Sequence, residues 1–265
     1  MVAVTMAIGR HRFSHDGLSL SYLDAGGDGA PLVALHAHWL EGQTFAPLAL
    51  ELAPAWRVIA LDQRGHGHSD HARSYRREDY LGDLGALLRH LSIDHAVLLG
   101  NSLGGLNAFQ FAARHRAMAR ALIIVDIFAE IGTDPDMANA WAGTFPTRQA
   151  LLERVGPRFA AFLMPSFRQT AAGWTLAFDP KDMAASTAAS NGSHWDDWTA
   201  TDCPALLIRG SESRVTTAEQ MTQMAERRPG TQLVTLEAGH VAYMDNAVGF
   251  TQAVRAFLDA LPPRP

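Results

Sequence analysis

The residues with the clearest chemical potential form the pentapeptide Gly100-Asn-Ser-Leu-Gly104, which stands between an apolar run and an Ala-rich stretch. A serine between glycines at this spacing is typical of a sharp strand-to-helix turn that holds the hydroxyl at its tip. The flanking residues must be small because the strand and the helix nearly collide there. The start of a helix also favours developing negative charge near Ser102. We therefore predict that Ser102 is a nucleophile.

A serine hydroxyl is a weak nucleophile and needs a base, usually a histidine oriented by a carboxylate. In open sheets of parallel strands, functional residues collect beyond the carboxyl ends of the strands. His240 follows the last apolar run directly, in Glu237-Ala-Gly-His240, and comes after the serine in the chain. His240 is therefore the predicted base.

Two carboxylates follow other strand ends in a suitable chain order. Asp126 ends the apolar run 121–125, and Glu212 lies in the loop Gly210-Ser-Glu-Ser-Arg214 after the next-to-last apolar run. We rank Asp126 first and keep Glu212 as the alternative acid. Glu237 shares the short loop of His240 and is interpreted as a solvated charge.

The oxygen that becomes negative during attack by a serine needs two backbone N–H donors. One donor is expected from the residue after the nucleophile, Leu103, and the other from the loop after an early buried strand. That loop is His36-Ala-His-Trp39, and we assign the second donor to His38. The imidazole of His38 and the indole of Trp39 are also candidates for the pocket wall.

Alternating strands and helices must position these residues. Period-two alternation around Asp16-Gly17 predicts a β-hairpin. Continuous apolar runs predict buried strands at 31–35, 56–61, 96–99, 121–125, 205–208 and 232–236. Helical spacing is present at 44–52, 77–91, 103–115, 218–227 and 248–261. This alternation predicts an α/β fold, with a mostly parallel sheet, helices on both faces and the hairpin at one edge.

The alternation stops between Phe128 and Thr199. This segment has no parallel-strand signal, is dense in aromatic residues, and offers short helices at 148–155 and 180–189. We interpret it as an insertion into the sheet-forming chain.

Composition limits the classes of partner. The 265 residues carry a net charge of −5, which gives no basic footprint for nucleic acid. No run of about 18 apolar residues exists, so we expect no membrane span. Cys203 is the single cysteine, which favours a reducing compartment and a cytoplasmic location. The N-terminal stretch 1–8 lacks the basic region of a signal peptide.

Alternating histidines could suggest a metal site, as in His36 with His38 or His66 with His68. No further ligands cluster at a supporting spacing. We therefore expect no metal and no cofactor. We also expect the substrate to be a small molecule.

Together, these segments resemble the α/β-hydrolase fold superfamily, specifically the small single-chain serine hydrolases with a helical cap. The matching pieces are Leu35-His-Ala37, Asp62-Gln-Arg-Gly-His-Gly-His-Ser69, Gly100-Asn-Ser-Leu-Gly104, Val125-Asp126 and Gly239-His240. The resemblance implies an eight-stranded sheet, a Ser-acid-His triad, and a small, mainly helical cap inserted after the sixth strand. The core would then comprise residues 1–127 and 200–265, and the cap residues 128–199.

The chain departs from the family pattern at two places. The family commonly has His-Gly where this chain has His36-Ala37, and a methyl group there narrows the oxyanion loop or shifts its backbone. In many relatives the acid stands at the position of Ser213, and in others at the position of Asp126. This departure is the main reason for preferring Asp126 over Glu212.

Serine at the turn implies an acyl-enzyme route. We expect hydrolysis of an ester-like bond, in a carboxylester, a thioester or a lactone. A carbon–carbon bond or an amide is the alternative for the same triad, and a cofactor-free oxygenase or a ligand receptor is the alternative from another class. The oligomeric state stays open.

The aromatic cap predicts an apolar or aromatic substrate. The residues expected to line the pocket are Trp39, Phe128, Trp141 and Phe145. Four cap arginines, namely Arg148, Arg154, Arg158 and Arg168, are candidates to hold a substrate carboxylate, although each one singly fits a solvated helix charge better.

Overall fold

The computed structural model describes residues 8–262. Most of the N-terminal stretch 1–8, which lacks the basic region of a signal peptide, lies outside the described residues. No helix within residues 8–262 is both long and apolar enough to cross a lipid bilayer.

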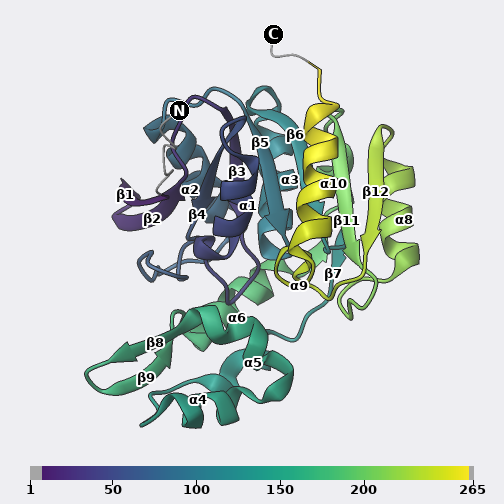
Figure 1. Cartoon of the computed structure of the whole chain (residues 1–265). Coiled ribbons are helices and arrows are strands. Elements are labelled where there is room, and N and C mark those ends of the chain that lie inside the picture. The colour runs from purple at the N-terminus through teal and green to yellow at the C-terminus, as the bar shows by residue number, and fades with distance from the viewer. Residues whose placement is uncertain (1–7, 263–265) are drawn as a thin grey trace.

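An eight-stranded sheet forms the centre of the molecule, with the strand order β1-β2-β4-β3-β5-β6-β11-β12 (Figure 1). The hairpin β1–β2 is antiparallel, as is the pairing of β2 with β4, and all other neighbours in the sheet are parallel. The strands are β1 (Gly9–His15), β2 (Leu18–Asp24), β3 (Ala30–Leu35), β4 (Trp56–Leu61), β5 (Ala96–Asn101), β6 (Ala119–Val125), β11 (Ala205–Gly210) and β12 (Thr231–Leu236). The predicted α/β class, the mostly parallel sheet and the hairpin at its edge are confirmed.

The turn of the edge hairpin has the backbone that its sequence predicts. Asp16 and Gly17 both have positive φ, at 48° and 75°. Two-residue hairpin loops favour this left-handed geometry because it matches the twist of the flanking strands.

Helices cover both faces of the sheet. On one face, α2 (Arg77–His90), α3 (Leu103–Arg114) and α8 (Ala218–Arg227) bury their apolar side chains in one core cluster. On the other face, the short 3₁₀ helix η1 (Gly42–Phe45), α1 (Ala46–Leu52), α9 (Ala242–Asp245) and α10 (Ala247–Asp259) contribute to a second cluster. The parallel strands, buried on both faces, therefore read as continuous apolar runs.

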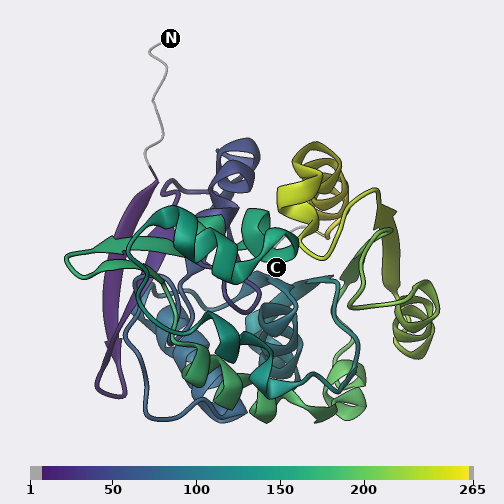
Figure 2. The ribbon, with the colours of Figure 1, turned by 90° about the horizontal axis from the view of Figure 1, so that it is seen from below.

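The insertion between β6 and β11 packs over the carboxyl ends of the strands as a separate lobe (Figure 1). Its elements are β7 (Glu130–Ile131), η3 (Pro135–Trp141), α4 (Arg148–Val155), α5 (Pro157–Leu163), η4 (Met164–Ser166), β8 (Phe167–Thr170), β9 (Gly173–Leu176), α6 (Pro180–Ser190), β10 (Gly192–Ser193) and α7 (Trp195–Thr199). Helices α4 and α6 lie where short helices were predicted. The antiparallel pairs β8–β9 and β7–β10 were not predicted. Figure 2 shows that the lobe leaves β12 and α8 uncovered.

The last helix of this segment, α7, packs with the core. Trp198 is fully buried, its ring lies 5.8 Å from that of Phe109, and its indole N–H donates to the carbonyl of Met224 at 2.8 Å. Helix α7 thus joins the layer of α3 and α8, although it falls within the range 128–199 that was predicted to be the cap.

Candidate active site

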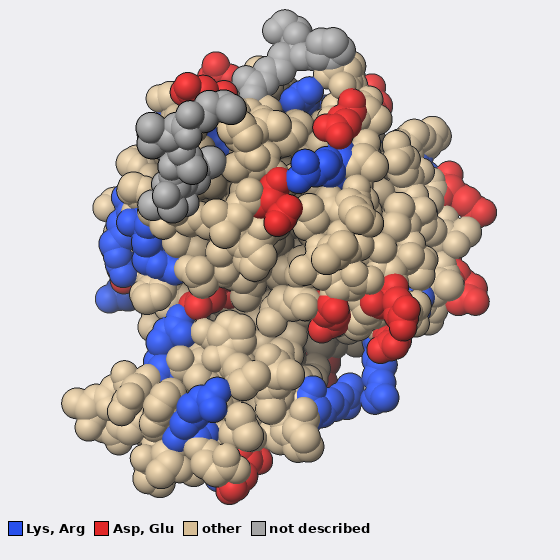
Figure 3. Space-filling model, in the orientation of Figure 1, with Lys and Arg blue, Asp and Glu red and all other residues tan. Residues whose placement is uncertain are grey.

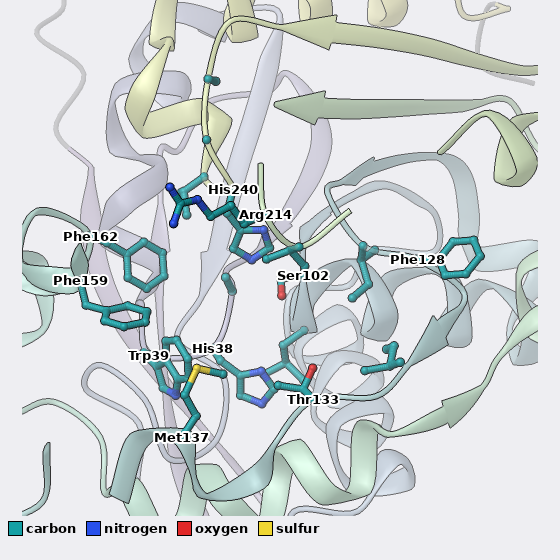
Figure 4. Close-up of a pocket in the computed structure, with 18 of the residues that line it drawn as sticks. His38, Trp39, Ser102, Phe128, Thr133, Met137, Phe159, Phe162, Arg214 and His240 are labelled. Carbon is teal, nitrogen blue, oxygen red and sulfur yellow. The ribbon is translucent and has the colours of Figure 1, made fainter. Parts of the chain in front are cut away.

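Ser102 lies on a sharp turn between β5 and α3. Its backbone has φ 53° and ψ −118°, which is strained for a residue with a side chain. Its N–H donates to the carbonyl of Val125 at 3.0 Å, so the neighbouring strand β6 holds the turn in place. The turn directs the side chain into a cavity beneath the cap (Figure 4).

Two glycines are needed at this turn because other backbone lies against them. A Cβ on Gly100 would come within 2.1 Å of the carbonyl oxygen of Gly104. A Cβ on Gly104 would come within 2.1 Å of the carbonyl oxygen of Leu35. The two glycines of the motif are therefore required because β5, α3 and the loop after β3 lie very close together at this turn.

His240 and Asp126 form a hydrogen-bonded pair beside this serine. Nδ1 of His240 lies 2.6 Å from Oδ2 of Asp126, whose side chain is fully buried. The carboxylate also accepts hydrogen bonds from the hydroxyls of Ser213 and Thr216. Such a carboxylate fixes the proton on Nδ1 and leaves Nε2 free to take a proton. Figure 4 shows the His240 ring next to Ser102 on the cavity wall.

The alternative acid, Glu212, occupies a different position. It lines the rim of the same cavity, and its side chain is exposed. Nδ1 of His240 is already bound to Asp126, so the geometry favours Asp126 as the orienting group. Ser213, which stands at the position of the acid in many relatives, contacts the same carboxylate through its hydroxyl.

The loop after β3 lines the cavity beside Ser102 and carries His38, the expected second oxyanion donor, while Leu103, the expected first donor, begins α3. Ala37, His38 and Leu103 line the cavity together with Ser102. Ala37 is almost fully buried and packs in the core cluster on the α1 side of the sheet. The fold therefore accommodates the methyl group that distinguishes this loop from the common His-Gly pattern.

Buried His36 ties the oxyanion loop to the glycine-rich loop after β4. Its Nδ1 lies 2.8 Å from the carbonyl oxygen of Ala37, and its Nε2 accepts from the N–H of Gln63 at 3.0 Å. The Gln63 side chain returns a hydrogen bond to the carbonyl of His36 at 2.7 Å. Burial lowers the pKa of His36 to about 4, so the ring is neutral at physiological pH.

The geometry does not support a metal site at the alternating histidines. Within residues 8–262, no three His, Cys, Asp or Glu side chains are grouped so that they could hold a metal ion. The rings of His36 and His66 pack edge to face at 5.0 Å, and His66 contacts the carbonyl of Arg64 at 2.9 Å.

The cavity has a volume of about 1470 Å³ and lies between the core and the cap. Trp39 and Phe128 line it, as predicted. Trp141 and Phe145 are not among its lining residues, so the prediction placed them wrongly. Trp141 is buried behind Trp39, at a ring distance of 5.1 Å, and Phe145 pairs its backbone with Trp174 inside the cap.

Other apolar cap residues take the places that were predicted for Trp141 and Phe145. Phe159 and Phe162 of α5, together with Met137 of η3, line the cavity opposite Phe128 (Figure 4). Helix α5 itself was not predicted, because a seven-residue helix leaves little periodic signal. An aromatic wall therefore exists, but a different helix supplies it.

Of the four candidate arginines, Arg158 alone lines the cavity. Arg168 forms an ion pair with Glu41. The other two stack on cap aromatics, Arg148 on Phe167 and Arg154 on Phe145.

A further arginine, Arg214, lines the cavity from the loop after β11 (Figure 4) and was not singled out by the sequence. Glu212 and Glu237 line the same rim. Figure 3 shows acidic and basic side chains near one another around the hollow between the core and the cap. The mouth of the cavity thus carries charges of both signs.

Comparison with known proteins identifies the family of the chain. The family model for the alpha/beta hydrolase fold matches residues 31–247. The chain is 27% identical to 2-(acetamidomethylene)succinate hydrolase from Mesorhizobium japonicum, over 88% of this chain and 90% of that one. It is 28% identical to pimeloyl-[acyl-carrier protein] methyl ester esterase from Xanthomonas campestris pv. campestris, over 91% and 100% of the two chains. The crystal structure of E-2-(acetamidomethylene)succinate hydrolase superposes with a TM-score of 0.86 at 24% identity, covering 96% of this chain and 100% of that one, and this likeness concerns the fold alone.

Proposed function

Since the chain belongs to the alpha/beta hydrolase fold family, we propose that it is a serine hydrolase that cleaves an ester-like bond of a small molecule through an acyl-enzyme. The observation that carries the proposal is the contact of 2.6 Å between His240 Nδ1 and the buried carboxylate of Asp126, beside Ser102 on its strained turn. This arrangement supports the proposal, because a serine and a histidine suited as nucleophile and base line one cavity and a carboxylate suited to orient the histidine is buried behind it.

The first half of the reaction acylates the serine. Nε2 of His240 takes the proton of Ser102 while Oγ forms a bond to the carbonyl carbon of the substrate. The carbonyl oxygen becomes negative and binds the backbone N–H groups of Leu103 and His38. When the tetrahedral intermediate collapses, the bond to the leaving group breaks, and His240 donates the proton to that group.

The second half of the reaction releases the acyl group. A water molecule gives one proton to Nε2 of His240 while its oxygen attacks the acyl carbon. The bond to Ser102 then breaks, and the serine recovers its proton from His240. Asp126 stays ionised and stabilises the imidazolium in both halves.

The cavity supports an apolar or aromatic substrate. Trp39, Phe128, Phe159 and Phe162 present apolar surface around Ser102, and such surface binds apolar groups that leave water. The methyl ester named for the Xanthomonas relative is consistent with this substrate class.

Hydrolysis of an amide-bearing substrate is the second candidate. The name of the Mesorhizobium relative contains an acetamido group and a dicarboxylic acid, and Arg158 and Arg214 line the cavity here. Two arginines could pair with substrate carboxylates. Acidic rim residues oppose that pairing, so we rank the ester first.

A fluorophosphonate probe tests the proposal. The probe should label the wild-type protein at Ser102 and should leave Ser102→Ala unlabelled, and short aryl esters should be hydrolysed by the wild type alone. Absence of labelling together with oxygen consumption on an aromatic substrate would favour the cofactor-free oxygenase. Cleavage of acetamidomethylene succinate in preference to all esters would favour the second candidate.

A further inference from the structure

The imidazole of His38 belongs to a hydrogen-bond chain that runs from the oxyanion loop through the cap to α2. Its Nε2 lies 2.9 Å from Oγ of Ser186 in α6, and that hydroxyl lies 2.7 Å from the phenol oxygen of Tyr80 in α2. Ser186 is fully buried, and Tyr80 nearly so. The ring of His38 lines the cavity and lies on the other side of Ser102 from His240 (Figure 4).

The protons in this chain can be assigned because buried donors need acceptors. Within residues 8–262, the one hydrogen-bond partner of the Tyr80 phenol is Oγ of Ser186, so the phenol donates to it. The hydroxyl of Ser186 must then donate its own proton, and His38 Nε2 is its one remaining partner in the described chain. Nε2 is therefore an acceptor, which puts the ring proton of a neutral His38 on Nδ1.

The surroundings keep this ring neutral. Burial lowers the pKa of His38 well below its usual range, and the nearby His66 and Arg77 lower it further. Arg77 is itself buried, and its guanidinium donates to the amide oxygens of Asn107 and Gln110. A buried cation near the ring opposes a second positive charge.

Nδ1–H of His38 opens onto the cavity. No side-chain or backbone atom among the described residues accepts a hydrogen bond from it. Some side-chain atoms of residues 8–262 are both buried and without a partner, but Nδ1 of His38 is not one of them. This nitrogen is therefore accessible from the cavity. A neutral donor on the cavity wall near a nucleophile can bind an uncharged acceptor on the substrate.

We propose that His38 Nδ1–H is a specificity-determining donor that binds a second carbonyl oxygen on the acyl part of the substrate. This inference rests on the proposed function, because the acyl part is defined by attack of Ser102. The backbone N–H of His38 would hold the oxyanion, and its side chain would hold the second oxygen. The preferred substrates would then be esters of oxo acids. Ser186 and Tyr80 are positioning residues that fix the tautomer.

Matched substrates test the proposal without assuming the spacing between the two carbonyls. The p-nitrophenyl esters of 4-oxopentanoate, 5-oxohexanoate and 6-oxoheptanoate are each compared with the ester in which a methylidene group replaces the ketone. The two members of a pair have nearly the same shape, and only one has the acceptor oxygen. The wild type should prefer the ketone in kcat/KM by about fivefold to tenfold in at least one pair.

Substitutions of His38 identify the donor. In His38→Asn the amide nitrogen occupies the place of Nδ1 and should keep most of the preference, whereas His38→Leu should bring the ratio close to one. Ser186→Ala and Tyr80→Phe should lower the ratio because they release the tautomer. A wild-type ratio near one in all pairs, an unchanged ratio in His38→Leu, or loss of the preference in His38→Asn would overturn the proposal.

Two controls separate this proposal from the proposed function. Hydrolysis of the methylidene esters by the wild type, but not by Ser102→Ala, shows that the serine hydrolase is intact whatever the ratio is. Long-range ¹H–¹⁵N NMR then reads the tautomer without any substrate, with His38→Asn used to assign the ring signals. A protonated Nδ1 between pH 6 and 8 is expected, and a protonated Nε2 would contradict the assignment.

Discussion

Replacement of Asp126 by asparagine tests how the buried carboxylate serves His240. The carboxylate accepts from three donors, namely His240 Nδ1–H and the hydroxyls of Ser213 and Thr216, and it is fully buried. An amide has the same shape but no charge, so it cannot stabilise the imidazolium. If its NH₂ faces Nδ1, it also forces the ring proton onto Nε2, which then cannot accept from Ser102.

The expected loss follows from these contacts. Removal of the corresponding charge in another triad lowers kcat by about 10⁴-fold, or about 5 kcal/mol of transition-state stabilisation. Stopped-flow or steady-state assays with a p-nitrophenyl ester measure this loss directly. The matched control is Glu212→Gln, which removes the exposed carboxylate on the rim and should keep kcat within about twofold of the wild type.

A relocated acid sharpens the same test. Because the hydroxyl of Ser213 already contacts Asp126, an aspartate at position 213 would bring a carboxylate near His240. The double variant Asp126→Asn with Ser213→Asp should therefore recover about 10- to 100-fold of the lost kcat. The reasoning would be refuted if Asp126→Asn kept more than about a tenth of the wild-type kcat, or if Glu212→Gln caused the larger loss.

Three further predictions concern the fold. Gly100→Ala should lower the free energy of unfolding, measured by urea titration, by at least about 3 kcal/mol, because its Cβ would meet the carbonyl of Gly104. The control is Gly132→Ala, where a Cβ would point into open space, and it should change the free energy of unfolding by less than about 1 kcal/mol. Burial lowers the pKa values of His36 and His66 to about 4 and about 3. The unfolded chain therefore binds more protons below about pH 6.5, so stability is full above that pH and falls by a few kcal/mol toward pH 4; a flat urea midpoint over this range would contradict the assignment. Trp198→Ala should cost about 3–5 kcal/mol and should unfold the core and the cap in one transition, since α7 packs in the core; loss of the cap alone would show the opposite.

Local chemistry made most of the sheet predictable. The continuous apolar runs of the parallel strands and the Asp16-Gly17 turn are local signals, and the strand-to-helix turn at Ser102 is set by the glycines that its backbone requires. The pairing of Asp126 with His240 also follows from chain order, because both residues lie beyond the carboxyl ends of parallel strands, β6 and β12, on either side of β11.

The cap was less predictable because the way in which it packs on the core decides which of its residues face Ser102. Trp141 and Phe159 are both aromatic residues in short elements, yet Trp141 packs behind Trp39 while Phe159 lines the cavity. The hairpin β8–β9 lacks the Asn-Gly or Asp-Gly turn that marks a hairpin in sequence. Contacts between residues distant in the chain, such as His38 with Ser186, have no local signal at all.

The central claim is that Ser102 carries the acyl group during turnover. Acid quenching of the protein during hydrolysis of p-nitrophenyl acetate, followed by intact-mass and peptide mass spectrometry, measures this directly. The account predicts a mass increase of one acetyl group, located on Ser102. The acetylated fraction should rise in the wild type when deacylation is slowed, and no acetyl adduct should form in Ser102→Ala. Turnover without any adduct, or an adduct on another residue with full activity in Ser102→Ala, would contradict it.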